Sequence, residues 1–64
     1  MRWTDTQEIA LALEEHHSGC DVAHLRFTDL YRWILDLPGF RDDPEKSSER
    51  ILEAIQMAWL AERD

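Results

Sequence analysis

Residues 48–61 read Ser-Glu-Arg-Ile-Leu-Glu-Ala-Ile-Gln-Met-Ala-Trp-Leu-Ala and carry the strongest periodic signal in the chain. Apolar residues recur there at spacings of three and four, which is the period of one face of an α-helix. They are Ile51, Leu52, Ile55, Ala58 and Trp59. The hydroxyl of Ser47 or Ser48 can accept a free backbone N–H of the first turn, so either serine is a suitable N-cap. We therefore expect a helix over 48–61 that buries this stripe.

A helix is also expected near the start of the chain, over 5–17, where an apolar stripe forms around Ile9 and Leu13. Ser18-Gly19 is a typical end for such a helix. Two pairs at its start can form a capping box, in which each side chain binds a backbone N–H of the other residue. They are Thr4 with Gln7 and Asp5 with Glu8.

The remaining helix is expected over 28–37, with the hydroxyl of Thr28 as N-cap and Asp29 placed favourably in the first turn. Pro38-Gly39 ends it, because proline disfavours helical geometry in the residue before it. Residues 20–26 allow two structures, a short helical turn capped by Asp21 or an extended segment. Residues 38–47 are expected to form a loop with Phe40 as its only large apolar anchor.

Three amphipathic helices in 64 residues indicate one all-α domain over 1–64, a compact bundle of helix-turn-helix type. Five aromatic residues are expected to close its core. They are Trp3, Phe27, Trp33, Phe40 and Trp59.

The charge is strongly acidic, with 7 Lys and Arg against 14 Asp and Glu, a net charge of −7. Such a chain repels phosphate backbones and attracts basic protein surfaces and hard cations. The single Cys20 excludes an intramolecular disulfide and suits a reducing compartment. No apolar run approaches a membrane span, and the N-terminus lacks a signal-peptide pattern. We expect a cytoplasmic monomer with no nucleic-acid or membrane partner.

Sequence motifs of catalysis are missing, since there is no Gly-rich phosphate loop, no Gly-x-Ser-x-Gly and no Cys-x-x-Cys. We therefore expect a protein that is not an enzyme and has no catalytic residues. A DNA-binding winged helix is the rival class. It is disfavoured because the expected helices present mainly carboxylates where base-reading Arg, Lys, Asn or Gln would stand.

Two polar clusters are candidate metal sites. His16, His17, Cys20, Asp21 and His24 have ligand types that suit zinc or ferrous iron, but they straddle a helix end and also fit a polar helix terminus. Asp29 and Asp36 lie seven residues apart on one helix face, with Asp42-Asp43 just beyond. These four carboxylates fit either a shallow iron site or a solvated surface that keeps the protein soluble.

Three groups of residues along the chain resemble the IscX family of iron–sulfur cluster assembly proteins. The first group is Trp3-Thr4-Asp5, Glu8-Ile9 and Ala12-Leu13. The second is Arg26-Phe27-Thr28-Asp29, Trp33-Ile34, Asp36-Leu37, Phe40 and Asp42-Asp43-Pro44. The third is Glu49, Ile51-Leu52-Glu53-Ala54-Ile55 and Trp59. The chain departs from the family pattern at Pro38-Gly39 and Arg41, positions that can be acidic in other members.

The resemblance implies a winged-helix-like domain with a reduced wing. It also implies a role as a non-enzymatic adaptor or regulator that binds the cysteine desulfurase through an acidic face. Glu8, Asp29, Asp36, Asp42 and Asp43 would belong to that face, with Arg26 as an exposed partner residue, and the contact itself is expected at Glu8, Arg26, Asp29 and Asp36. Weak, transient binding of Fe²⁺ or Fe³⁺ is implied as well, at Asp29, Asp36, Asp42 and Asp43. A generic acidic protein-interaction module is the alternative function.

Overall fold

The structure, a computed structural model, describes residues 1–63, which form three α-helices and two 3₁₀ turns. The elements are α1 (Thr6–His16), η1 (Val22–His24), α2 (Phe27–Leu35), η2 (Pro44–Lys46) and α3 (Glu49–Glu62). The predicted all-α class is confirmed. Residues 1–63 contain no β-strand that could form a wing, so the winged-helix likeness stays an expectation. No helix in the described range is long and apolar enough to cross a membrane.

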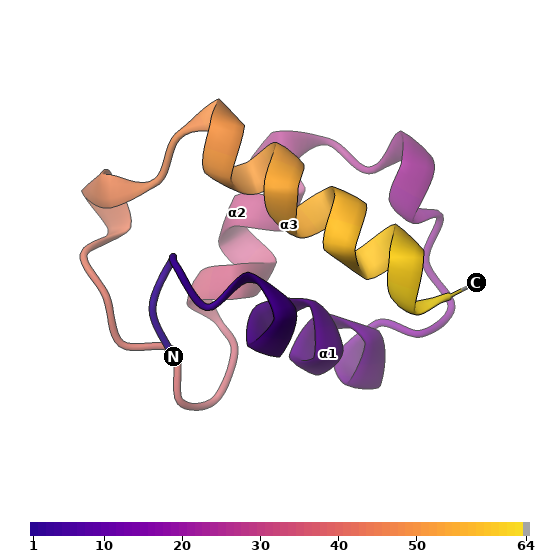
Figure 1. The fold of residues 1–64 in the computed structure, drawn as a ribbon, viewed down its shortest axis with the longest axis horizontal. Helices are drawn as coiled ribbons and strands as arrows, with labels where there is room; N and C mark the ends of the chain where they lie inside the picture. Colours follow the sequence, from indigo (N-terminus) through magenta and orange to yellow (C-terminus); the bar gives the residue numbers. More distant parts are fainter. Residues whose placement is uncertain (64) are drawn as a thin grey trace.

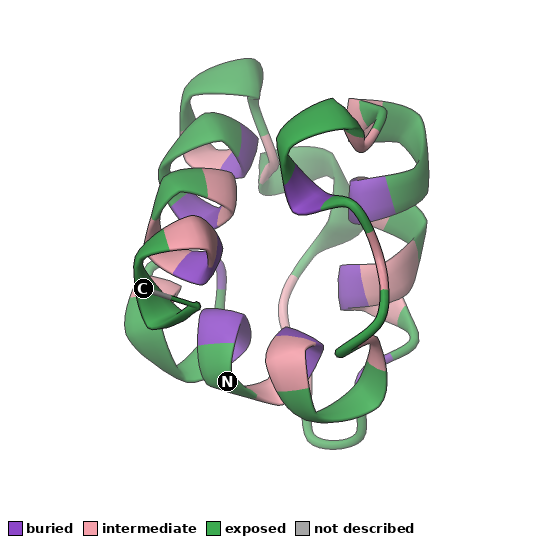
Figure 2. Cartoon of the chain, turned by 90° about the vertical axis from the view of Figure 1, so that its right-hand side faces the viewer, coloured by how far each residue is buried: buried purple, intermediate pink, exposed green. Residues whose placement is uncertain are grey.

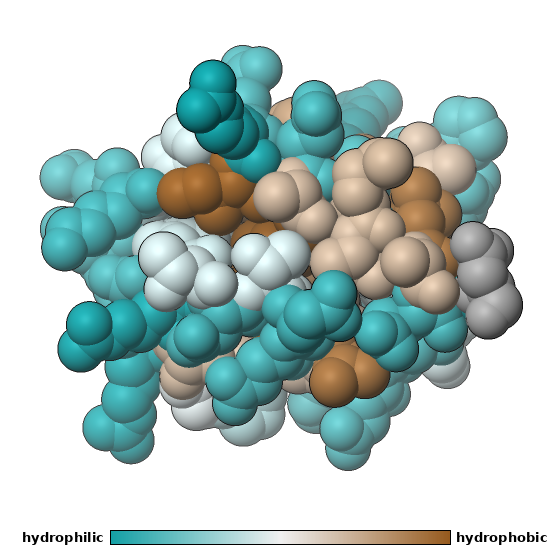
Figure 3. All heavy atoms as spheres, in the orientation of Figure 1, coloured by the Kyte–Doolittle hydropathy of each residue, from teal (hydrophilic) through white to brown (hydrophobic). Residues whose placement is uncertain are grey.

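The helices α1 and α3 share the largest interface, and α2 lies behind them (Figure 1). The buried residues of each helix lie on the side that faces the other helices (Figure 2). Hydrophilic residues cover much of the face in Figure 3, and apolar residues show mainly over α3. Met57 on α3 and Leu11 on α1 are the large exposed apolar residues of the described range.

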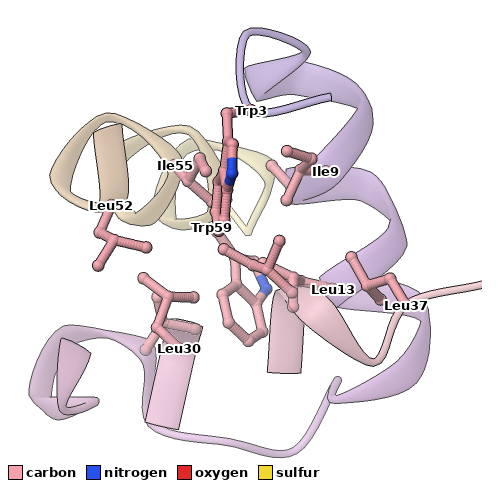
Figure 4. Packing of buried hydrophobic residues seen from close by; sticks show 11 residues of the cluster. Trp3, Ile9, Leu13, Leu30, Leu37, Leu52, Ile55 and Trp59 are labelled. Carbon is pink, nitrogen blue, oxygen red and sulfur yellow. The ribbon is translucent and has the colours of Figure 1, made fainter. Parts of the chain in front are cut away.

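The core is built around α3, whose Leu52, Ile55 and Trp59 are buried as its periodicity predicts (Figure 4). Trp59 is 0% exposed, and its ring packs edge-on against Trp33 with centroids 6.3 Å apart. The other buried members are Trp3, Ile9, Ala10, Leu13, Val22, Leu30, Ile34 and Leu37. Of the five aromatic residues expected in the core, Trp3 and Trp59 are buried. The remaining three, Phe27, Trp33 and Phe40, are half-buried and pack against the core from its edge.

The start of α1 differs from the prediction, because neither capping box forms. Asp5 is the N-cap residue, but its carboxylate accepts the backbone N–H of Arg2 at 2.8 Å instead of an N–H of the helix. The backbone N–H of Asp5 is itself donated to the carbonyl of Arg2 at 2.9 Å, so Glu8 has no N–H to bind there. Asp5 thus stabilises the turn that carries Trp3 into the core.

The start of α2 was also predicted wrongly. The helix begins at Phe27, Arg26 is its N-cap residue, and Thr28 lies in the first turn. The helix ends at Leu35, two residues before the predicted end, with Asp36 as C-cap. By contrast, the capping of α3 by Ser48 is confirmed, since its hydroxyl accepts the N–H of Ile51 at 3.3 Å.

The two connecting segments contain short 3₁₀ turns, where the sequence allowed a helical turn or an extended segment over 20–26 and predicted a loop over 38–47. In the first, η1 forms a turn without a side-chain cap, and Leu25 and Arg26 then run extended. In the second, Gly39 adopts φ +86, a left-handed conformation that glycine tolerates, and η2 follows.

Trp3 anchors the segment that leads to η2, a role that the sequence analysis gave to Phe40 alone. Its ring is 2% exposed, stacks on Tyr31 at 5.9 Å and meets Phe40 edge-on at 4.8 Å. Its indole Nε1–H donates to the carbonyl of Asp43 at 2.8 Å. The Trp3 side chain therefore helps to hold the N-terminal residues against the segment 38–46. Two hydrogen bonds of Met1 join the same segments, from its amino group to the carbonyl of Gly39 at 2.6 Å and from the N–H of Arg41 to its carbonyl at 2.8 Å.

Candidate functional site

The four predicted partner-binding residues all lie exposed on the surface. Asp29 stands in the first turn of α2 and Asp36 at its C-cap, so the two carboxylates lie on the same side of the helix, two turns apart. We call Asp29 and Asp36 the α2 acidic pair. Arg26 precedes α2, and Glu8 stands in the first turn of α1. Within residues 1–63 none of these four residues takes part in an ion pair.

Asp42 and Asp43 accept backbone hydrogen bonds, which the sequence pattern did not indicate. The Asp42 carboxylate accepts the backbone N–H of Trp3 at 3.1 Å and that of Asp43 at 2.7 Å. The hydrogen bond from Trp3, followed by that from Asp43, holds the pKa of Asp42 below its ordinary value. Asp43 in turn caps η2 by accepting the N–H of Glu45 at 2.9 Å. Both carboxylates thus help to fix the segment beside Trp3.

The structure does not bring the four predicted iron ligands together as a ligand set. Residues 1–63 contain no group of three or more His, Cys, Asp or Glu side chains that could hold a metal ion. The backbone hydrogen bonds of Asp42 and Asp43 already occupy oxygen atoms that a cation would need. A preformed four-carboxylate centre is therefore not supported, and weak iron binding stays a prediction.

The histidine and cysteine residues near the end of α1 lie in separate contacts. The ring of His17 stacks on Trp33, with centroids 3.9 Å apart and planes 3° from parallel. The Nδ1 of His24 lies 2.8 Å from an oxygen of Asp21 on the exposed surface. Cys20 is half-buried. This arrangement fits the interpretation of the segment as a polar helix terminus.

Arg63 organises this region, although no pattern in the sequence indicates such a role. Its Nη2 donates to the carbonyls of His17 at 3.1 Å and Ser18 at 3.0 Å, and its Nη1 donates to the carbonyl of Cys20. Its Nε binds Glu14 at 2.7 Å, and Glu14 also accepts the indole N–H of Trp59 at 2.8 Å. These three carbonyls lie just beyond the last residue of α1, so an arginine from the other end of the chain stabilises the segment after the helix. Arg63 and Glu14 are far apart in the sequence, so no local sequence pattern predicts their contact.

Acidification is expected to destabilise the fold in two stages. Burial, helped by the adjacent His16, lowers the pKa of His17 below its ordinary 6.5. The hydrogen bond from Arg63, followed by that from Trp59, lowers the pKa of Glu14 below 4.5, and Asp42 is shifted in the same direction from 3.8. Each group binds protons more readily when unfolded, so stability falls as the pH drops through these ranges.

Thermal unfolding followed by circular dichroism should show a Tm that is level above pH 7, declines below about pH 6.5 and declines more steeply below about pH 4.5. His17→Gln should flatten the first decline, and Glu14→Gln should weaken the second. A Tm that rises between pH 7 and pH 5 would contradict the prediction.

These features define a class, a small acidic helical domain that presents unpaired carboxylates on its surface. The whole chain, residues 1–64, matches the family model described as iron–sulphur cluster assembly. The chain is also 50% identical, over all of its 64 residues and 97% of the relative's length, to an uncharacterized protein of Pseudomonas aeruginosa. The chain belongs to the IscX family, whose members are involved in iron–sulphur cluster assembly. The resemblance found in the sequence is confirmed.

Proposed function

We propose that this protein is a non-enzymatic adaptor that binds the cysteine desulfurase of the cluster assembly machinery. The contact would use the α2 acidic pair together with Arg26 and Glu8. The observation that carries the proposal is the state of the pair: Asp29 and Asp36 are exposed, lie on one side of α2 and have no ion-pair partner within residues 1–63. Membership in the assembly family supports a partner within that machinery.

Charge gives this contact a simple physical basis. The chain carries a net charge of −7, so its long-range field attracts a basic surface and speeds the encounter. The pair then fixes the orientation, because two carboxylates about 10 Å apart along a helix can meet two basic groups at once. Exposed charges are screened by salt over about 10 Å at 0.1 M ionic strength, so binding should weaken as salt is added.

Reversing both charges of the pair, Asp29→Lys with Asp36→Lys, is expected to raise the Kd for the purified desulfurase at least about tenfold, which corresponds to about 1.4 kcal/mol. The matched control is Glu15→Lys with Glu53→Lys, which changes the net charge equally at exposed positions on α1 and α3. Glu14 is unsuitable as a control because it binds Trp59 and Arg63. Calorimetric titration at two salt concentrations measures both variants.

Equal losses in the two double variants would show that net charge, rather than the α2 acidic pair, governs the contact. Failure of the unaltered protein to bind the desulfurase at low salt would reject the proposal. Retention of a basic protein from outside the cluster assembly machinery would then favour a generic acidic interaction module.

A further inference from the structure

A groove opens between the N-terminal ends of α2 and α3, which both lie toward the upper edge of Figure 1. Its volume is about 340 Å³. The residues that line it are Phe27, Thr28, Tyr31, Ser47, Ser48, Glu49 and Leu52. Neither the fold nor the proposed desulfurase contact accounts for it.

The floor and walls of the groove are apolar. Leu52 is buried and projects from α3 toward Leu30 of α2 (Figure 4), while Phe27 and Tyr31 are half-buried. Tyr31 is held in place from both sides, since its ring stacks on Trp3 and its hydroxyl donates to the carbonyl of Pro44 at 3.1 Å. The volume is at the low end of the roughly 300–1,000 Å³ typical of ligand sites. The groove therefore has room for one large apolar side chain rather than a cofactor.

The rim of the groove carries a single charge. Glu49 is the only charged residue that lines it, and within residues 1–63 its carboxylate has no ion-pair partner. The neighbouring Thr28 and Ser47 add hydroxyl groups that can donate or accept hydrogen bonds. An occupant that fits this chemistry fills the apolar floor and places a cationic group beside Glu49.

We propose that the groove docks a segment of a partner protein in which a large aromatic or aliphatic side chain lies next to a Lys or Arg. This surface borders the α2 acidic pair at Thr28, which precedes Asp29, but it faces another direction, because Tyr31 and Asp29 point about 160° apart around the helix. The inference therefore goes beyond the desulfurase contact and does not depend on it. A single docked side chain gives weak affinity by itself and adds to that of a second contact elsewhere on the chain.

The direct test is an NMR titration of the ¹⁵N-labelled chain with the capped dipeptide N-acetyl-Phe-Arg amide. Saturable shifts are expected for amides of residues 27–31 and 47–52, with binding at least tenfold weaker for N-acetyl-Ser-Arg amide and for N-acetyl-Phe-Glu amide. Glu49→Gln should reduce the preference for Arg over Glu at least threefold. Glu45→Gln, an acidic position outside the groove lining, should leave it unchanged. Shifts centred elsewhere, or none that saturate, would overturn the proposal.

A blocking variant tests whether the groove itself holds the dipeptide, and the two binding measurements separate this proposal from the desulfurase contact. Thr28→Trp places a large ring in the groove and should weaken dipeptide binding at least tenfold, whereas Gln7→Trp, exposed in the first turn of α1, should not. Dipeptide binding without desulfurase binding would reject only the proposed function. Desulfurase binding with no dipeptide binding by the unaltered chain would reject only the groove. Groove shifts that appear on concentrating the protein alone would identify a second copy as the occupant and contradict the proposed partner.

Discussion

Trp59→Ala is expected to lower the free energy of unfolding of the domain more than any other single substitution considered for it. The ring is fully buried between α1, α2 and α3, and replacing such a side chain costs about 3–5 kcal/mol through lost burial and the cavity left behind. A domain of this size has a free energy of unfolding of roughly 3–10 kcal/mol, so the substitution removes a large share of it. The variant also removes the indole that donates to Glu14 and carries the Arg63 guanidinium 5.3 Å above it.

Urea unfolding followed by circular dichroism measures this loss. Met57→Ala is the matched control, because Met57 lies two residues earlier on the same helix and is 61% exposed. That control should change the free energy of unfolding by about 0.5 kcal/mol or less, as surface substitutions usually do. If the two variants were equally stable, the assignment of the α3 stripe to the core would be wrong.

Trp3→Ala is expected to destabilise the fold by about 3 kcal/mol and to loosen one part of it more than the rest. The ring fills the space between Tyr31 and Phe40, and its indole N–H holds the carbonyl of Asp43. Amide hydrogen exchange should therefore speed up most in the segment 38–46, with smaller changes in α1 and α3.

Trp3→Phe separates packing from hydrogen bonding, because it keeps an aromatic ring but has no N–H donor. We expect the loss of the hydrogen bond to Asp43 to contribute about 1 kcal/mol to the drop in the free energy of unfolding of Trp3→Phe, which is the usual net value of one hydrogen bond. The smaller ring adds a further loss of packing. Uniform acceleration of exchange over the whole chain in Trp3→Ala would contradict a local anchoring role.

Sequence periodicity predicted the helices well where the apolar stripe and the cap agree. For α3, the stripe through Leu52, Ile55 and Trp59 and the cap at Ser48 were both confirmed. Prediction failed where a local capping pattern competed with a distant contact. Asp5 has the right spacing to cap α1, yet its carboxylate binds the backbone N–H of Arg2, because the turn before the helix places Trp3 in the core. A capping pattern shows only which local hydrogen bonds are possible. Burial of a tryptophan side chain stabilises the fold by more free energy than one N-cap hydrogen bond does.

In the candidate site, too, the sequence predicted the local spacing correctly but not the contacts between distant residues. The spacing of Asp29 and Asp36 placed both carboxylates on one side of α2, and the structure leaves them exposed. Nothing in the sequence distinguished Asp42 and Asp43 from this pair, so all four carboxylates were predicted to form one group. In the structure both carboxylates accept hydrogen bonds from the backbone, because a carboxylate that lies beside a free backbone N–H group binds it readily.

The amino-acid order by itself determined the helical class, the family and the acidic character of this protein, because periodicity, motif residues and charge count are properties of the chain alone. Tertiary structure alone decided which charges are structural and which are free. Arg63 meets Glu14 and the carbonyls after α1 only when α3 packs on α1, and Glu49 reaches the rim of a groove only when α2 lies beside α3. Each of these contacts joins residues far apart in sequence, so no local pattern records it, and packing of the shared core brings them together.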